Sequence, residues 1–133
     1  MKKNFFLILI TLFTFSCDEN TLTVDPTVLT GTWRVVDVLV DPGDGSGTFM
    51  SIDSDKTMRF FESGTVRTNS EFCDFSQDIN LFLETTYSSS DSIIYVECDD
   101  FEWDMPFELR DENLILYYLC DEPCVERYVK VSN

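Results

Sequence analysis

The chain has 133 residues, of which 25 are acidic and 9 are basic, and its formal net charge is −16. This length predicts one domain, and the negative charge repels phosphate, which argues against a nucleic-acid partner. Because the chain has no histidine, it has no serine–histidine–aspartate triad, no cysteine–histidine pair and no imidazole metal site. Hydrophobic residues make up 44% of the sequence, which is enough for a packed core.

The N-terminal segment has the pattern of an export signal. Two lysines precede an apolar run over residues 5–15, which is shorter than the roughly 20 residues of a membrane-spanning helix. The run ends at Ser16 and Cys17, a boundary that resembles a bacterial lipobox, in which a small residue precedes the lipidated cysteine. We therefore expect a lipoprotein signal peptide over residues 1–16 and a lipid, including palmitate, on Cys17. A plain signal peptide with an incidental cysteine is the alternative.

A lipid on Cys17 would anchor the protein to a membrane. Loss of the signal removes two lysines, which changes the net charge from −16 to −18. Asp18 and Glu19 weakly resemble the surface-export signal of Bacteroidetes-type lipoproteins, so we expect an outer-membrane lipoprotein on either the periplasmic or the cell-surface face. The polar composition of residues 17–29 is typical of a tether between lipid and domain.

Four further cysteines predict two disulfides, because an even number in a small exported domain is typical of a disulfide framework. Three pairings are possible. Cys120 and Cys124 frame a short Asp-Glu-Pro segment and suit a tight turn, which leaves Cys73 to pair with Cys98. The rival is a four-cysteine zinc site, but the paired Cys-x-x-Cys spacing of such sites is absent.

Residues 30–133 show strand patterns, separated by turn signals about every 8–12 residues. The clearest alternation places Trp103, Met105, Phe107 and Leu109 on one face, and the last strand places Val125, Arg127, Val129 and Val131 on one face. We predict strands at 32–40, 56–61, 64–69, 78–87, 92–98, 103–110, 113–119 and 124–131. Short connections favour an all-β, eight-stranded antiparallel up-and-down β-barrel over residues 30–133, with a two-sheet β-sandwich as the alternative.

The start of the first strand carries Gly31-Thr32-Trp33, which resembles the lipocalin signature. The layout of the whole chain resembles the lipocalin-like lipoproteins of Bacteroidetes: a lipobox, Leu-x-Gly-x-Trp, a glycine-rich first loop and a late Cys-x-x-x-Cys. The resemblance of the domain covers about residues 29–131. The resemblance implies a closed barrel base formed by Gly31, Trp33 and Arg127, with the arginine packed over the tryptophan ring. In the alternative, Trp33 is only a core aromatic and Arg127 points outward.

The resemblance also implies a function, that of a monomeric, membrane-anchored binding module for a small hydrophobic ligand, without a cofactor. Inward residues near the open end would then contact the ligand, and the candidates are Val35, Leu39, Leu81, Leu83, Met105, Phe107 and Leu109. Each of them also suits a plain core. The alternative is a structural or interaction lipoprotein with a filled core, which acts through its surface.

The glycine-rich loop over residues 41–47 is a weak candidate for a calcium site through Asp41 and Asp44, although the EF-hand spacing is absent. A solvated loop is the alternative, and we assign no metal site. Close carboxylate pairs arise by chance among 25 acids, and no histidine is present to activate a thiol. We therefore expect no enzyme activity.

Overall fold

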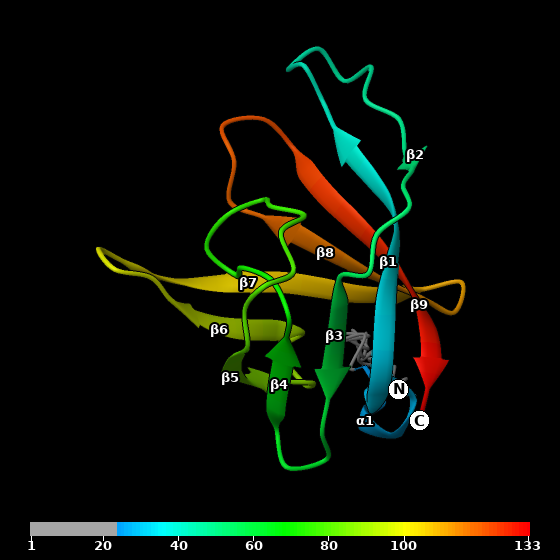
Figure 1. The fold of residues 1–133 in the computed structure, drawn as a ribbon, viewed down its shortest axis with the longest axis vertical. Coiled ribbons are helices and arrows are strands. Elements are labelled where there is room, and N and C mark those ends of the chain that lie inside the picture. The colour runs from blue at the N-terminus through cyan, green and yellow to red at the C-terminus, as the bar shows by residue number, and fades with distance from the viewer. Residues whose placement is uncertain (1–23) are drawn as a thin grey trace, which may run out of the picture.

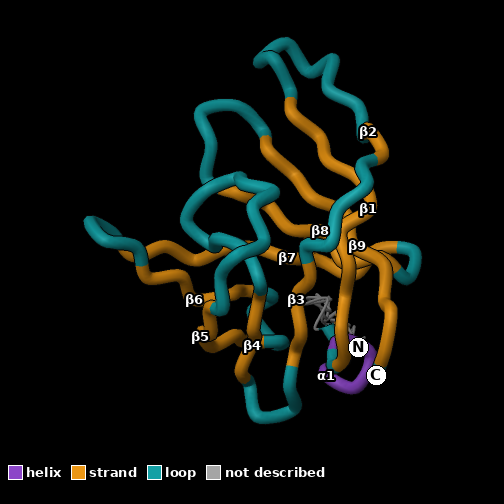
Figure 2. The backbone as a smooth tube through the Cα atoms, in the orientation of Figure 1, coloured by secondary structure: helices purple, strands orange, loops and turns teal. Residues whose placement is uncertain are grey.

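The computed structural model describes residues 24–133 as an antiparallel β-barrel (Figures 1 and 2). The predicted signal peptide, Cys17 and most of the tether lie outside these residues. The elements in chain order are α1 (Pro26–Leu29), β1 (Gly31–Val40), β2 (Met50–Ser51), β3 (Thr57–Phe60), β4 (Thr65–Thr68), β5 (Leu83–Ser88), β6 (Ile93–Glu97), β7 (Glu102–Arg110), β8 (Asn113–Tyr118) and β9 (Cys124–Ser132).

Each barrel strand pairs with the next along the chain, and β9 returns to pair with β1. The predicted eight-stranded up-and-down barrel is therefore confirmed, and the sandwich is excluded. The sequence did not predict β2, which pairs with β1 only at Asp37 and Val38. This short extra strand pairs with the second half of β1, on the same edge that pairs with β3 in its first half (Figure 1).

The predicted strand at 78–87 is wrong in its first half. Strand β5 begins at Leu83, which pairs with Thr68 at the end of β4, and before it a single main-chain bond, from the Leu81 amide to the Asn69 carbonyl, continues the ladder. Residues 69–82 form a loop instead. Ile79 and Leu81, whose alternation suggested a strand, are 36% and 37% exposed in that loop.

The end of the expected tether packs on the barrel. The side chain of Asp25 caps α1 by accepting a hydrogen bond from the Thr27 amide, and Pro26 starts the helix, where a missing N–H costs nothing. Leu29 at its end is fully buried. The folded unit therefore begins a few residues before residue 30, the predicted start of the domain.

A β-bulge in β1 reverses which residues face the interior. Val35 pairs with Tyr128, but Asp37 pairs with Arg127, so one residue is inserted between these two cross-strand pairs. Cross-strand partners share a face. Beyond the bulge, Leu39 therefore lies on the outer face, opposite Val125.

The interior face of β9 is the opposite of the predicted one. Cys124, Glu126 and Tyr128 are buried, and the last two are fully buried. Arg127, like the valines that alternate with it, belongs to the outer face. Hydrophobic alternation failed here because the interior holds the charged Glu126, whose partner Lys56 lies just before β3.

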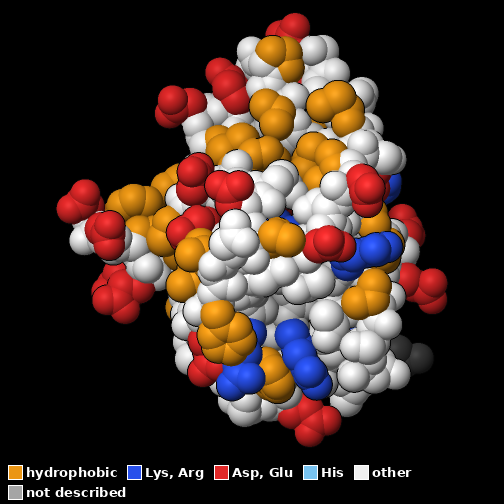
Figure 3. All heavy atoms as spheres, in the orientation of Figure 1, with side chains coloured by type: hydrophobic (Ala, Val, Ile, Leu, Met, Phe, Trp, Pro, Cys, Tyr) orange, Lys and Arg blue, Asp and Glu red, His pale blue; other side chains and the backbone are white. Residues whose placement is uncertain are grey.

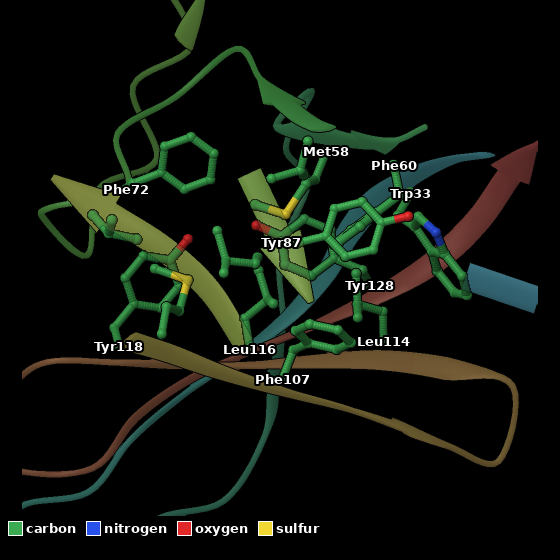
Figure 4. Close-up of a cluster of buried hydrophobic side chains, with 14 of the residues drawn as sticks. Trp33, Met58, Phe60, Phe72, Tyr87, Phe107, Leu114, Leu116, Tyr118 and Tyr128 are labelled. Carbon is green, nitrogen blue, oxygen red and sulfur yellow. The ribbon is translucent and has the colours of Figure 1, made fainter. Parts of the chain in front are cut away.

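Aromatic and aliphatic side chains from all around the barrel meet in its interior (Figure 4). Phe60 packs edge-to-face on Tyr87 with ring centroids 5.0 Å apart, and its centroid lies 5.8 Å from that of the tilted Phe107 ring. Five hollows of residues 24–133 open at the surface, and the largest of these five has a volume of about 660 Å³. The centre of the barrel is a packed core.

The up-and-down order gives the barrel two distinct ends. One end, which we call the base, carries α1, the C-terminus and the turns at 61–64, 88–92 and 111–112. We call mouth the end that carries the loops at 41–49, 69–82, 98–101 and 119–123. Figure 1 shows α1 beside the C-terminus at the base.

Candidate functional site

The base is closed by Trp33, which is 1% exposed and whose indole N–H donates a 2.8 Å hydrogen bond to the Leu29 carbonyl. Gly31 begins the strand with a φ of +128°, a conformation that other residues rarely adopt, and a Cβ there would collide with the Ser132 carbonyl. Gly31 and Trp33 thus lie where the predicted barrel base placed them. The bond to Leu29 also explains why the end of the tether is ordered.

The cation over Trp33 is Lys130, and the prediction of Arg127 in that place is wrong. The Lys130 ammonium lies 5.5 Å from the ring centroid and donates a hydrogen bond to the Val28 carbonyl. Arg127 points outward and pairs with Asp37, at 2.7 Å from Nε to Oδ2. Lys130 is three residues closer to the C-terminus than Arg127 and is paired with Trp33 near the base, on the opposite face of β9.

Asp37, Arg127 and β2 form a small polar cluster on the outer face. Ser51 donates a hydrogen bond to Asp37, and the Arg127 guanidinium lies 5.0 Å from the centroid of the Phe49 ring. Burial raises the pKa of Asp37, but the hydrogen bonds from Ser51 and Arg127 outweigh it, so the pKa is lowered. The ion pair joins β1 to β9, and the Ser51 hydrogen bond and the Phe49 contact fasten β2 and the residue before it to this pair.

The predicted ligand contacts do not form one site. Val35, Met105 and Phe107 are at most 3% exposed and belong to the packed core. Leu39 is on the outer face because of the bulge, and Leu81 lies in the exposed loop. The remaining two are only partly buried and lie apart, Leu83 on β5 and Leu109 near the base.

The mouth is covered by the loop over residues 69–82, which we call the plug. Phe72 is 4% exposed, and Phe75 packs edge-to-face on Tyr118, with centroids 5.4 Å apart. The Cys73–Cys98 disulfide, the plug disulfide below, fastens this loop to the end of β6. Apolar side chains and a covalent bond thus hold the plug in the entrance through which a ligand would pass.

A buried ion pair lies under the plug. The ammonium of Lys56 is 2.9 Å from Glu126 Oε1, and both side chains are fully buried. Lys56 also donates to the Ser76 carbonyl at 2.7 Å, and Gln77 donates to Glu126 at 2.6 Å. The ion pair therefore holds the plug as well as filling the barrel.

Two tyrosines complete this cluster. Tyr128 donates a hydrogen bond to Glu126 Oε2, and the Lys56 ammonium lies 4.9 Å from the centroid of the Tyr118 ring. The Tyr118 hydroxyl is buried and has no hydrogen-bond partner among the described residues. Burial and the negative charge of Glu126 raise the pKa of Tyr118 well above its usual value, and Tyr128 is shifted in the same direction by burial.

Sequence reasoning missed Lys56 and Glu126. Burial lowers the pKa of Lys56, and the charge of Glu126 partly offsets the effect. The only hint in the sequence was that Glu126 alternates with Cys124 and Tyr128, two residues that suit an interior. The valines on the other face are more apolar and pointed to the opposite assignment. Apart from the Tyr118 hydroxyl, the polar groups of the cluster are bonded to one another or to the plug, so the site is occupied by its own side chains.

The second predicted disulfide, Cys120–Cys124, is present and closes the β8–β9 turn at the mouth; we call it the turn disulfide. Both pairings expected from the sequence are thereby confirmed. The nearby loop that was a weak calcium candidate is organised differently. Asp41 accepts hydrogen bonds from the amides of Gly43, Gly45 and Gly47 at 2.6–3.0 Å, and these bonds lower its pKa.

That arrangement does not suit a cation. Both oxygens of Asp41 are directed at N–H donors, whereas a calcium ion needs converging oxygens. Asp44 accepts from the Ser46 amide and does not join Asp41 in a shared site. Within residues 24–133, no group of three acidic, cysteine or histidine residues is arranged to hold a metal.

Two neighbouring hollows lie where β5 and β6 separate toward the mouth. Their volumes are about 450 and about 660 Å³, and both are lined by Thr85, Val96 and Glu97. Their linings hold several carboxylates and no lysine or arginine. Because they share these three residues, the two hollows form one continuous concave region of the barrel wall.

Comparison with models of known protein families, with curated proteins and with solved structures gives no match to this chain. In the described part of the chain, no helix has both the length and the apolar character needed to span a membrane.

Proposed function

We propose that this protein is an exported, membrane-anchored β-barrel that binds a partner at its outer surface and has no catalytic role. The observation that carries the proposal is the filled interior. Fully buried side chains that include Trp33, Phe60, Tyr128 and the Lys56–Glu126 pair occupy the space where a carrier would hold its ligand. This favours the interaction lipoprotein over the carrier of a small hydrophobic ligand.

The mouth supports the same proposal. A carrier needs an entrance that opens, but the plug is bonded covalently to β6 and is held by Phe72, Phe75 and the buried ion pair. Opening it would break a disulfide or expose an ammonium and a carboxylate that are now paired without water. Both events are costly, so the barrel is better suited to present a surface than to exchange a ligand.

The proposed anchor on Cys17 would also orient the barrel. Six residues separate Cys17 from Val24, the first described residue, and a chain of that length spans at most about 25 Å. Because α1 lies at the base, the base would face the membrane and the mouth would face away from it. The acidic loops of the mouth would then meet partners from the surrounding solution.

Uptake of hydrophobic molecules tests this proposal. The purified full chain is mixed with a fatty acid and with a hydrophobic fluorescent dye, and native mass spectrometry and fluorescence measure binding. We expect bare protein and no dye signal. A Phe107→Ala variant is the positive control, because it opens a cavity in the core that can admit a small apolar molecule.

One bound fatty acid per wild-type chain, with core amides protected on binding, would restore the carrier. If the wild type and the cavity variant bind the dye equally well, the carrier function is likewise restored. If only the variant binds, the interior of the natural protein is closed and the surface is left as the functional part.

A further inference from the structure

The barrel wall is incomplete between β5 and β6. Their ladder consists of two pairs near the base, Ser88 with Ile93 and Tyr87 with Ile94. Beyond them the strands diverge toward the mouth. The hydroxyl of Thr85 donates to the Tyr95 carbonyl at the point of divergence, so a side chain replaces the next rung of the ladder.

The main-chain groups that face this opening follow from the hydrogen bonds on the other side of each strand. The main-chain N–H of Tyr87 donates to the Gly64 carbonyl, so the main-chain groups of Tyr87 are directed at β4. The main-chain groups of Thr86 and Glu84, which alternate with it, are directed at β6. Cys98 donates to Phe101 in the β6–β7 turn, so Glu97 faces β5. Two strand edges thus present main-chain donors and acceptors to the same groove.

The groove is strongly acidic. Its two hollows are lined by Glu71, Glu84, Glu97, Asp99, Glu102 and Asp104. Of these six, only Glu84 forms an ion pair within residues 24–133, with Arg67. Acidic side chains also surround the tip of the protruding β6–β7 hairpin, which borders the groove (Figure 3).

We propose that this groove binds an extended, positively charged peptide segment of a partner protein. Main-chain groups on a strand edge recognise an extended chain whatever its sequence, and the carboxylates select basic side chains. Tyr95, which is 42% exposed, and Trp103 supply aromatic faces on which a lysine or arginine can rest. The proposal rests on the surface-binding function above and names the surface and the partner chemistry.

A second copy of the chain is a poorer occupant. The protein carries 25 acidic residues against 9 basic ones, so an acidic groove repels another copy. A free fatty acid is disfavoured for the same reason.

The test uses the isotope-labelled full chain and a short synthetic peptide of alternating lysine and valine. Two further probes are a glutamate–valine peptide and a lysine–valine peptide N-methylated at alternate residues, which keeps the charge but lacks half of the amide donors. Amide chemical shifts and hydrogen exchange give the site, and titration gives the dissociation constant. Uptake of the hydrophobic dye is measured on the same samples.

We expect the lysine–valine peptide to shift and protect the amides of Glu84, Thr86 and Glu97. N-methylation weakens binding by about tenfold or more, because main-chain hydrogen bonds are lost. The Glu97→Lys variant weakens binding by about three- to tenfold at low salt. The matched control Glu62→Lys changes the net charge equally in a turn at the base, and it leaves binding within about twofold.

Equal affinity of the N-methylated peptide overturns the proposal, since attraction would then depend on charge alone. Shifts confined to another surface, equal losses in the two lysine variants, or self-association through the same amides also overturn it. Melting curves confirm that each variant is folded. Failure of the peptide arm without dye uptake refutes this groove and leaves the proposed function intact, whereas uptake by wild type refutes the proposed function itself.

Discussion

Replacement of Glu126 by glutamine keeps the shape of this side chain and removes its charge, which isolates the buried ion pair. In the wild type, Glu126 accepts hydrogen bonds from Lys56, Gln77 and Tyr128 and is fully buried. In Glu126→Gln, the Lys56 ammonium stays buried with the Ser76 carbonyl and an amide as its polar neighbours. We expect a large loss of stability.

The magnitude follows from the distance. Two charges 2.9 Å apart attract by about 6 kcal/mol at the effective dielectric constant of about 20 that suits protein sites. Removal of one partner of a buried pair typically costs about 3–5 kcal/mol, in part because the remaining charge loses its compensation. For a domain of this size, that corresponds to a fall in melting temperature of about 12–20 °C.

The pH dependence gives an independent check. Burial lowers the pKa of Lys56, so the folded protein binds fewer protons than the unfolded chain between this lowered pKa and about 10.5. Stability therefore rises with pH in that window. Loss of Glu126 lowers the pKa of Lys56 further, so the variant should regain part of its lost stability as the pH rises from 7 toward 10.

Urea unfolding followed by tryptophan fluorescence at several pH values measures both effects. Glu112→Gln in the exposed β7–β8 turn is the matched control and should change stability by about 0.5 kcal/mol or less. A Lys56→Met change added to Glu126→Gln should recover stability, because no unpaired charge is then buried. A Glu126→Gln protein within about 0.5 kcal/mol of wild type at pH 7 would refute the buried pair.

Three further outcomes are expected from thermal and chemical unfolding. Trp33→Ala should lower stability by about 3–5 kcal/mol and Trp33→Phe by less, since the first change removes the buried ring that closes the base and the second removes mainly a hydrogen bond; a stable Trp33→Ala protein would contradict the closed base. Asp41→Asn should weaken the mouth loop and flatten the acid side of the stability profile, because a lowered pKa stabilises the fold above the unfolded pKa and the contribution is lost as pH falls through the folded pKa; unchanged acid sensitivity counts against the three amide bonds. Replacement of Cys73 and Cys98 by serine should cost about 3.5 kcal/mol and loss of the turn disulfide about 2 kcal/mol, because the plug disulfide closes a longer loop of 25 residues against 4; the reverse order would show that chain entropy is not the main term.

Local pattern was sufficient for most of the strands. Turn residues and period-2 alternation are short-range signals, and β7 shows how far they reach: Met105 and Phe107 are buried, as the alternation predicts. The disulfides were within reach too, because the turn between Cys120 and Cys124 is too short for many alternatives. The same local rules overextended β5, since a strand also needs a partner and β4 ends at Thr68.

The candidate site was less accessible from the sequence. Leu39 was expected inside, but one inserted residue in β1 moved it to the outer face. A bulge is a property of two paired strands, so the sequence of one strand does not reveal it. Lys56 and Glu126 are 70 residues apart, and neither has a neighbour in sequence that explains its burial.

The sequence by itself determined the class of fold and the strand count of the barrel, because both depend on side-chain periodicity. The short segment between Cys120 and Cys124 favoured one of the three possible disulfide pairings without deciding among them. Only the tertiary structure decided which face of β9 is inside, that Lys130 and not Arg127 covers Trp33, and that the interior is filled by a buried ion pair. The physical reason is that a charge can be buried only beside its partner, and that partner is chosen by closure of the barrel. The opening between β5 and β6 likewise exists only where two strands that could pair diverge.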